Sequence, residues 1–172
     1  DDVTLTADGS VTVGEIRAGT ATATVSAIGG GILDDATVAA VTADTVVLEA
    51  ATAIGLGDAV ETDANILRAS AGTSIDIAEQ SGVELQDVIA GDGPITISTN
   101  GDTTATSVRI FTNADGGDID LTVNTGDLGV DSVNANTLGD VSLSLGAGSV
   151  TDVDGDSAIS AADLSINVVG GS

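Results

Sequence analysis

The chain has 172 residues, of which 42% are hydrophobic, but its only aromatic residue is one phenylalanine and it has no histidine, cysteine or lysine. Its 27 acidic residues against three basic ones give a formal net charge of −24, which repels nucleic acid and anionic membrane surfaces and excludes both as partners. Because the usual general bases, thiol nucleophiles and Schiff-base amines are absent, we predict that the chain is not an enzyme.

Short segments in which aliphatic and polar residues alternate follow one another along the whole chain. Alternation with a period of two places one side chain in two on the inner face of a strand, and no stretch sustains a helical period. The alternating pairs, in chain order, are Val3/Leu5, Val11/Val13, Val25/Ala27, Val46/Leu48, Ile54/Leu56, Leu67/Ala69, Ile75/Ile77, Val88/Ala90, Ile95/Ile97, Val108/Ile110, Ile119/Leu121, Leu128/Val130, Val141/Leu143 and Leu164/Ile166.

Like pairs recur at a nearly constant step of 20 to 22 residues, the length of one solenoid coil. Stacked coils bury each other's inward side chains, and every strand finds hydrogen-bond partners in the neighbouring coils. The pattern predicts an all-β solenoid with about three short strands per coil of roughly 20–23 residues. The three predicted series are Val3, Val25, Val46, Leu67, Val88 and Val108; Ile32, Ile54, Ile75 and Ile95; and a fainter one of Ile16, Val38 and Val60.

A second interpretation is a β-hairpin meander or sandwich. Residues 3–13 read as a hairpin closed by an Asp8-Gly9 turn. Hairpins do not require a steady coil period over five steps, so the spacing favours the solenoid.

The first third of the chain recurs at its end. The stretch Val41–Ala51 is echoed by Ile159–Val169 at an offset of 118, and residues 1–54 as a whole resemble residues 117–172. We therefore expect one continuous solenoid over 1–172 that holds about one and a half copies of a ~117-residue repeat. The two periodicities disagree between Val83 and Asp118, where we expect one enlarged or irregular coil.

Several segments resemble the repeats of giant bacterial surface proteins, the filamentous-haemagglutinin-like adhesins and related long-repeat exoproteins. The run Thr42–Gly55, followed by Glu61–Asp63 and Leu67–Ala69, is similar to those repeats, and Gly93–Ser98 and Gly117–Thr122 look like their glycine-then-strand pieces. The resemblance covers most of the chain. It implies a right-handed parallel β-helix that is exported and acts at or beyond the bacterial cell surface.

One acidic loop has the spacing of a calcium-binding loop. Asp152, Asp154, Asp156 and Asp163 occupy loop positions 1, 3, 5 and 12, which in EF-hand-like loops hold the ion. Ser157 stands where that motif wants glycine, and Leu164 lies on a predicted strand where an EF-hand has a helix. The sequence predicts an acidic coil corner. Calcium is the candidate ion there, and these four aspartates are its candidate ligands. A paired-carboxylate glycosidase site at Asp118 and Asp120 is the weaker interpretation of acidic residues elsewhere.

The features together predict a structural role. Strand-like sequence runs from Val3 to Val169 without an amphipathic helix or polar cap, so we expect a piece of a longer solenoid. The predicted function is a segment of an extracellular or cell-surface fibre or adhesin shaft whose partners are copies of itself or adjoining repeats. The alternatives are an outer-wall binding module for surface glycans or proteins and, less favoured, a polysaccharide-active enzyme. No apolar run is long enough for membrane insertion.

Overall fold

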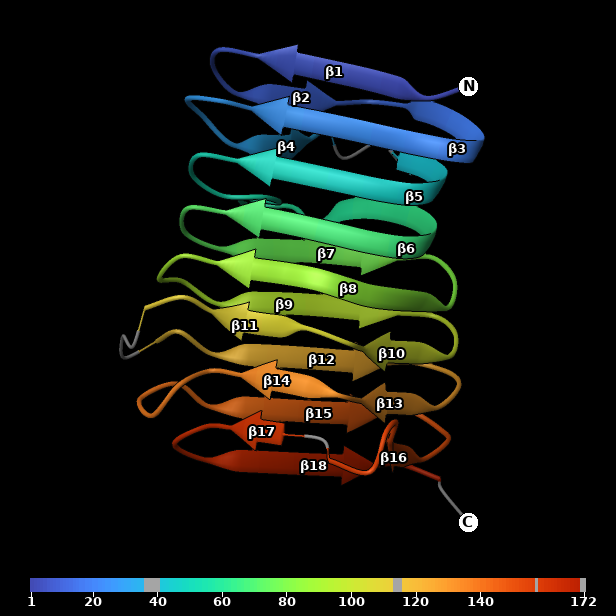
Figure 1. Cartoon of the computed structure of the whole chain (residues 1–172), viewed down its shortest axis with the longest axis vertical. Coiled ribbons are helices and arrows are strands. Elements are labelled where there is room, and N and C mark those ends of the chain that lie inside the picture. Colours follow the sequence, from blue (N-terminus) through green and yellow to red (C-terminus); the bar gives the residue numbers. More distant parts are fainter. Residues whose placement is uncertain (36–40, 113–115, 157, 171–172) are drawn as a thin grey trace.

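The computed structural model describes residues 1–35, 41–112, 116–156 and 158–170, and these form a parallel β-solenoid of about seven turns (Figure 1). The chain winds as a right-handed coil from the N-terminus at one end of the molecule to the C-terminus at the other, as expected for parallel crossovers. The described residues contain no helix, and therefore no helix that could cross a membrane. The predicted solenoid class is confirmed, and the hairpin alternative is wrong because every strand pair among these residues is parallel.

The strands form two broad walls, which we call the front and back walls after their positions in Figure 1. The front wall contains β1 (Val3–Ala7), β3 (Ile16–Ala27), β5 (Val41–Ala50), β6 (Val60–Ala71), β8 (Val83–Ala90), β10 (Thr103–Ala105), β11 (Val108–Ile110), β13 (Leu128–Val130), β14 (Ser132–Asn134), β16 (Val150–Asp152) and β17 (Ala158–Ser160). The back wall contains β2 (Val11–Val13), β4 (Ile32–Asp34), β7 (Ile75–Glu79), β9 (Ile95–Thr99), β12 (Ile119–Val123), β15 (Val141–Leu145) and β18 (Leu164–Val168).

The core consists of aliphatic side chains stacked in columns, one residue per coil. On the back wall Ile32, Ile54, Ile75 and Ile95 lie in register and are buried, which confirms the predicted isoleucine series. The same column extends through Val11 before them and through Ile119, Val141 and Leu164 after them. Identical branched side chains stack well because each occupies the same place in the cross-section as the one before it.

The front-wall series is only partly as predicted. Val46 pairs with Leu67 and Val88 with Val108, as expected. Leu67, however, pairs with Leu85, and Val88 pairs with Ala69, because this coil is shorter than the predicted step and its register shifts between Leu67 and Arg68. Val3 likewise pairs with Ala23 rather than Val25. The observed front-wall column is Leu5, Val25, Leu48, Ala69, Val88, Val108, Val133 and Ile159.

The fainter third series is wrong in its register. Ile16 pairs with Val41, and Val60 pairs with Ile77 of β7. Val38 lies outside the described residues. The reason is that β3, β5 and β6 are long strands that bend around one corner of the coil, whereas later coils replace this bend with a loop between separate strands.

The coil between Val83 and Asp118 marks this change in shape. The continuous strand β8 is followed by two short strands, β10 and β11, which pair with its two halves. Ile119 continues the back-wall column because it pairs with Ile95. The step from Ile95 to Ile119 is longer than the preceding step of the column. The extra residues of this coil nevertheless leave the pairing of the back-wall strands unchanged.

The two similar stretches at the ends of the chain lie on different walls. Val46 is on β5 of the front wall, while its sequence counterpart Leu164 is on β18 of the back wall. Both walls demand the same alternation of inward aliphatic and outward polar residues, so similar sequences fit either one. The sequence repeat therefore does not mark equivalent positions in the coil.

Glycine is required where neighbouring coils approach each other at a corner. A Cβ built on Gly91 would lie 2.0 Å from the carbonyl oxygen of Gly72 in the preceding coil. Gly55 combines a φ of +75° with a similar conflict at the carbonyl oxygen of Asp76. No L side chain fits at either position without moving backbone, so these corners fix the spacing between coils.

Candidate functional site

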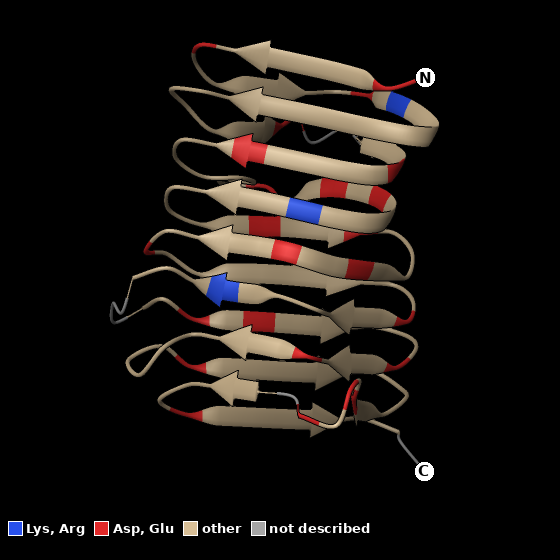
Figure 2. Cartoon of the chain, in the orientation of Figure 1, with Lys and Arg blue, Asp and Glu red and all other residues tan. Residues whose placement is uncertain are grey.

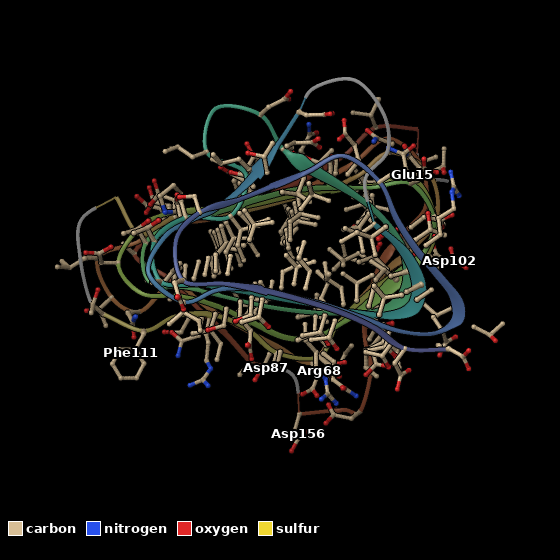
Figure 3. The ribbon with its side chains drawn as sticks, turned by 90° about the horizontal axis from the view of Figure 1, so that it is seen from above. Glu15, Arg68, Asp87, Asp102, Phe111 and Asp156 are labelled. Carbon is tan, nitrogen blue, oxygen red and sulfur yellow. The ribbon has the colours of Figure 1, made fainter. Side chains whose placement is uncertain are left out.

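The predicted calcium loop is an exposed turn between β16 and β17. The carboxylate of Asp152 accepts hydrogen bonds from the backbone N–H groups of Asp154, at 3.1 Å, and Gly155, at 2.7 Å. Gly155 takes the sharp bend with a φ of +90°. The pKa of Asp156 is raised, chiefly by a side-chain hydrogen bond with Asp154 and by the negative charge of that residue. Figure 3 shows Asp156 pointing away from the coil.

The structure does not bring Asp163 into this loop. Asp163 lies beyond β17, at the corner that leads into β18, and its backbone N–H donates to the carboxylate of Asp140 at 3.1 Å. The four predicted ligands therefore divide into a group of three and a single residue at another corner. Among the residues that the structure describes, no group of three or more acidic side chains is placed to hold a metal ion. Calcium binding by this loop stays a prediction.

A pair of thermal melts tests the calcium prediction. Because Asp163 is separated from the loop, we expect millimolar calcium to raise the melting temperature equally in the native chain and in Asp154→Asn, by general neutralisation of acidic charge. Melting by circular dichroism with calcium and with EDTA measures the difference. A rise confined to the native chain would establish a specific loop site and contradict this expectation.

Two carboxyl groups, those of Glu61 and Asp34, interact near the end of β4. The pKa of Glu61 is raised to about 7, first by a side-chain hydrogen bond with Asp34, then by desolvation and by the charge of Asp34. The pKa of Asp76 is also raised, by burial and by the charge of Asp58. A carboxyl–carboxylate hydrogen bond requires one protonated partner, which is consistent with the raised pKa of Glu61.

One carboxyl group lies inside the core. Glu79, at the end of β7, is fully buried; its carboxylate accepts hydrogen bonds from the Thr62 hydroxyl, at 2.7 Å, and from the backbone N–H groups of Ala64 and Ser81, at 3.2 and 3.1 Å. Burial raises its pKa, although these hydrogen bonds oppose the shift. The position was missed at the sequence level, yet the inward alternation of Ile75 and Ile77 already places Glu79 inside.

Glu79 sits where the cross-section of the solenoid changes. Its neighbour Thr62 belongs to the last of the bent strands, β6, and Thr99 follows Glu79 in the same column on β9. The Thr99 hydroxyl is 2.7 Å from the hydroxyl of Thr103, which begins the new strand β10. These buried polar side chains satisfy each other and the backbone at the transition, so their role is structural.

The outer walls carry the charge. Acidic residues lie on the outward faces and at the corners of the coils, and the three arginines lie on the front-wall strands β3, β6 and β11 (Figure 2). Arg68 donates to the side-chain oxygen of Gln86 at 2.6 Å, and Arg109 lies 4.0 Å from a carboxylate oxygen of Asp87. Asp118 and Asp120 flank the buried Ile119 on the outer face, as predicted. Figure 3 shows Arg68, Asp87 and Phe111 on the outside of the ring of strands.

The largest departure from a closed core is at the last described coil. Leu164 and Ile166 of β18 are each 50% exposed and Val168 is 39% exposed. Their partners one coil earlier, on β15, are buried in the same columns. At the other end Leu5 of β1 is 40% exposed, while Val25 in the next coil is fully buried. The inward columns are therefore partly exposed in the first and last described coils.

Comparison with models of known protein families, with curated protein sequences and with solved structures finds no match.

Proposed function

We propose that the chain is a structural segment of a long extracellular or cell-surface β-solenoid, a fibre or adhesin shaft that continues or associates end to end. The observation that carries the proposal is the exposure of Leu164, Ile166 and Val168, which occupy inward columns on β18. No described residue covers them.

Covering this face stabilises an assembly strongly. Fully burying one branched aliphatic side chain is worth about 1.5–3 kcal/mol, and three stand side by side on β18. The strand also has an open edge, whose backbone groups find partners when another parallel strand is added. A surface of this kind matches the next coil of a solenoid in shape, spacing and hydrogen bonding.

The remaining features suit a shaft. Apart from the buried Glu79, the described acidic residues lie on the outer walls and corners, where their charge keeps a long assembly dispersed (Figure 2). The stacked columns give rigidity in one dimension, because each coil contacts only its neighbours. Placement outside the cell rests on the resemblance to filamentous-haemagglutinin-like adhesins.

Substitution of Ile166 by aspartate tests the proposal. We expect the native chain to form end-to-end assemblies at micromolar concentration in sedimentation velocity, and Ile166→Asp to weaken the association by about 10- to 100-fold. Ile166 lies on the last strand, so the rest of the coil stack should keep its circular dichroism.

Leu56→Asp is the matched control. Leu56 is 70% exposed but lies on a side loop, away from the coil ends. It should leave the association constant unchanged. A native chain that stays monomeric at all concentrations, or an equal effect of the two substitutions, would contradict the proposal.

A further inference from the structure

We infer that Glu79 is the branch point of the front wall, where one bent strand gives way to two separate strands in the next coil. Its carboxylate takes the place of the strand that part of β6 lacks on that side, and it fixes the new corner between β7 and β8. This role is independent of end-to-end association, since it belongs to one coil transition in the middle of the chain.

Strand β6 has an unbroken partner on one side and a divided partner on the other. Towards the preceding coil it pairs with β5 in one constant register. Towards the next coil its first residues pair with β7, and its residues from Ile66 onward pair with β8. Among the described strands, none pairs with residues 63–65 on that side. Ala64 is only 2% exposed, so a backbone N–H left open there would be buried without a partner, which costs free energy.

The Glu79 carboxylate fills this gap. Its Oε1 atom accepts the Ala64 N–H at 3.2 Å and the Ser81 N–H at 3.1 Å, so one oxygen joins the divided part of β6 to the corner that leads into β8. The Ser81 hydroxyl lies 3.1 Å from the same oxygen, and Oε2 accepts the Thr62 hydroxyl at 2.7 Å. A carboxylate accepts several hydrogen bonds and requires no acceptor in return, which suits a site that gathers donors from two strands.

The column that contains Glu79 is polar only around this branch. In chain order its members are Ile16, Val41, Thr62, Glu79, Thr99, Val123, Leu145 and Val168. Aliphatic side chains fill the same place in the coils before and after, so packing does not require a carboxyl group there. A buried polar group costs free energy unless it is hydrogen-bonded. The confinement of polar residues to the coils where the wall divides therefore ties them to the division and not to the core in general.

Later coils are built on the corner that Glu79 holds. The Asn100 N–H donates to the Ser81 carbonyl at 3.3 Å, and the Thr125 hydroxyl donates to the Asn100 carbonyl at 3.0 Å. The corners that follow residues 80–82 are thus bonded to one another. Fixing the first corner of this type consequently fixes the path of those that follow.

Replacing the polar pair by valine tests this role against simple packing. The double variant Thr62→Val/Glu79→Val makes this part of the column as aliphatic as it is at Val41 and Val123. Apolar replacement of a buried polar pair is often neutral for stability, so packing alone predicts an unchanged branch. The branch-point role predicts that the backbone there opens.

Hydrogen exchange measured by NMR at one pH reports this opening. In the double variant the Ala64 and Ser81 amides lose their acceptor, and we expect both to exchange at least ~10-fold faster than in the native chain. The amide of Leu121, in β12, lies away from the branch between two intact strands and should keep its native rate.

Two single substitutions are the controls. Thr62→Val removes one donor but leaves the bonds from Glu79 to the backbone, so the Ala64 and Ser81 amides should stay within ~3-fold of their native rates. Glu79→Gln keeps an oxygen in the place of Oε1 and an amide group that can donate to the Thr62 hydroxyl. It should therefore restore native-like protection of both amides.

The exchange rates decide the role. Native-like rates for Ala64 and Ser81 in the double variant would overturn the inference, because the branch would then hold without the carboxylate. Equal rates in Thr62→Val and the double variant, or fast exchange of both amides in the native chain, would overturn it as well. A double variant that does not fold beside a folded Thr62→Val supports the inference, since apolar packing alone would have tolerated the change.

Discussion

Replacing Ile75 with alanine is expected to lower the free energy of unfolding by about 2–5 kcal/mol. Ile75 is buried between Ile54 and Ile95 in the back-wall column. The backbone of that column is held by coil-to-coil hydrogen bonds, such as that from the Ile75 N–H to the Pro94 carbonyl at 3.0 Å. The neighbouring coils therefore cannot collapse into the space that the lost methyl groups leave, and a cavity remains.

Thr96→Ala is the control for this substitution. Thr96 follows Ile95 on β9, but its side chain points outward and is exposed. It should change the stability by less than about 0.5 kcal/mol. Urea unfolding followed by circular dichroism gives both midpoints, and hydrogen exchange should show the extra opening around β7 and its neighbouring strands. Equal midpoints for the two variants would mean that the column does not carry the stability of the coil stack.

The back-wall column was predictable from sequence for a physical reason. Each back-wall strand begins directly after a tight corner. The number of residues from one member of the column to the next therefore varies little between Ile32 and Ile95, and the branched residues recur at a regular spacing. Buried side chains of one type at one spacing are the strongest signal that a solenoid leaves in its sequence.

The front wall was less predictable because its corner changes length. The bend within β6 uses residues that alternate like any strand, so alternation does not reveal where the wall ends. Between β6 and β8 the coil is shorter than the expected step, so Val88 pairs with Ala69, two residues beyond the expected Leu67. Register follows from the backbone path at such points, and a single sequence does not fix it.

The four aspartates of the predicted calcium loop lie at two different corners for a similar reason. The spacing of Asp152 to Asp163 holds an ion when a helix follows the loop, because a helix rises only 1.5 Å per residue. Here β17 (Ala158–Ser160) lies between Asp156 and Asp163, and a strand advances about 3.3 Å per residue, which carries Asp163 to another corner. Within the turn itself the carboxylate of Asp152 accepts the backbone N–H of Gly155.

Raising the pH from 5 to 8 is expected to destabilise the solenoid, because buried and paired carboxyl groups bind protons more tightly in the folded chain. Burial raises the pKa of Glu79 above its ordinary value of 4.5, and the Asp34 carboxyl raises that of Glu61 to about 7. A raised folded-state pKa contributes stability that is complete below the unfolded value and is lost as the pH rises through the folded value. The loss therefore begins near pH 4.5 and, for Glu61, is complete above about pH 7.

Two substitutions assign this loss to its sources. Glu79→Gln keeps an acceptor oxygen for Thr62 but cannot ionise, and Asp34→Asn removes the carboxyl partner of Glu61. A proton bound in only the folded or only the unfolded state changes the free energy of unfolding by about 1.4 kcal/mol per pH unit. Each variant should therefore reduce part of the dependence of the unfolding free energy on pH, and the double variant should remove most of it. Urea midpoints are measured between pH 5 and 8 in ~0.5 M salt. The salt screens the repulsion among the exposed carboxylates and leaves the buried group unscreened. If the native midpoint rose with pH, or if both variants kept the native slope, these carboxyl groups would be ionised in the folded chain and the solenoid would tolerate a charge in its core.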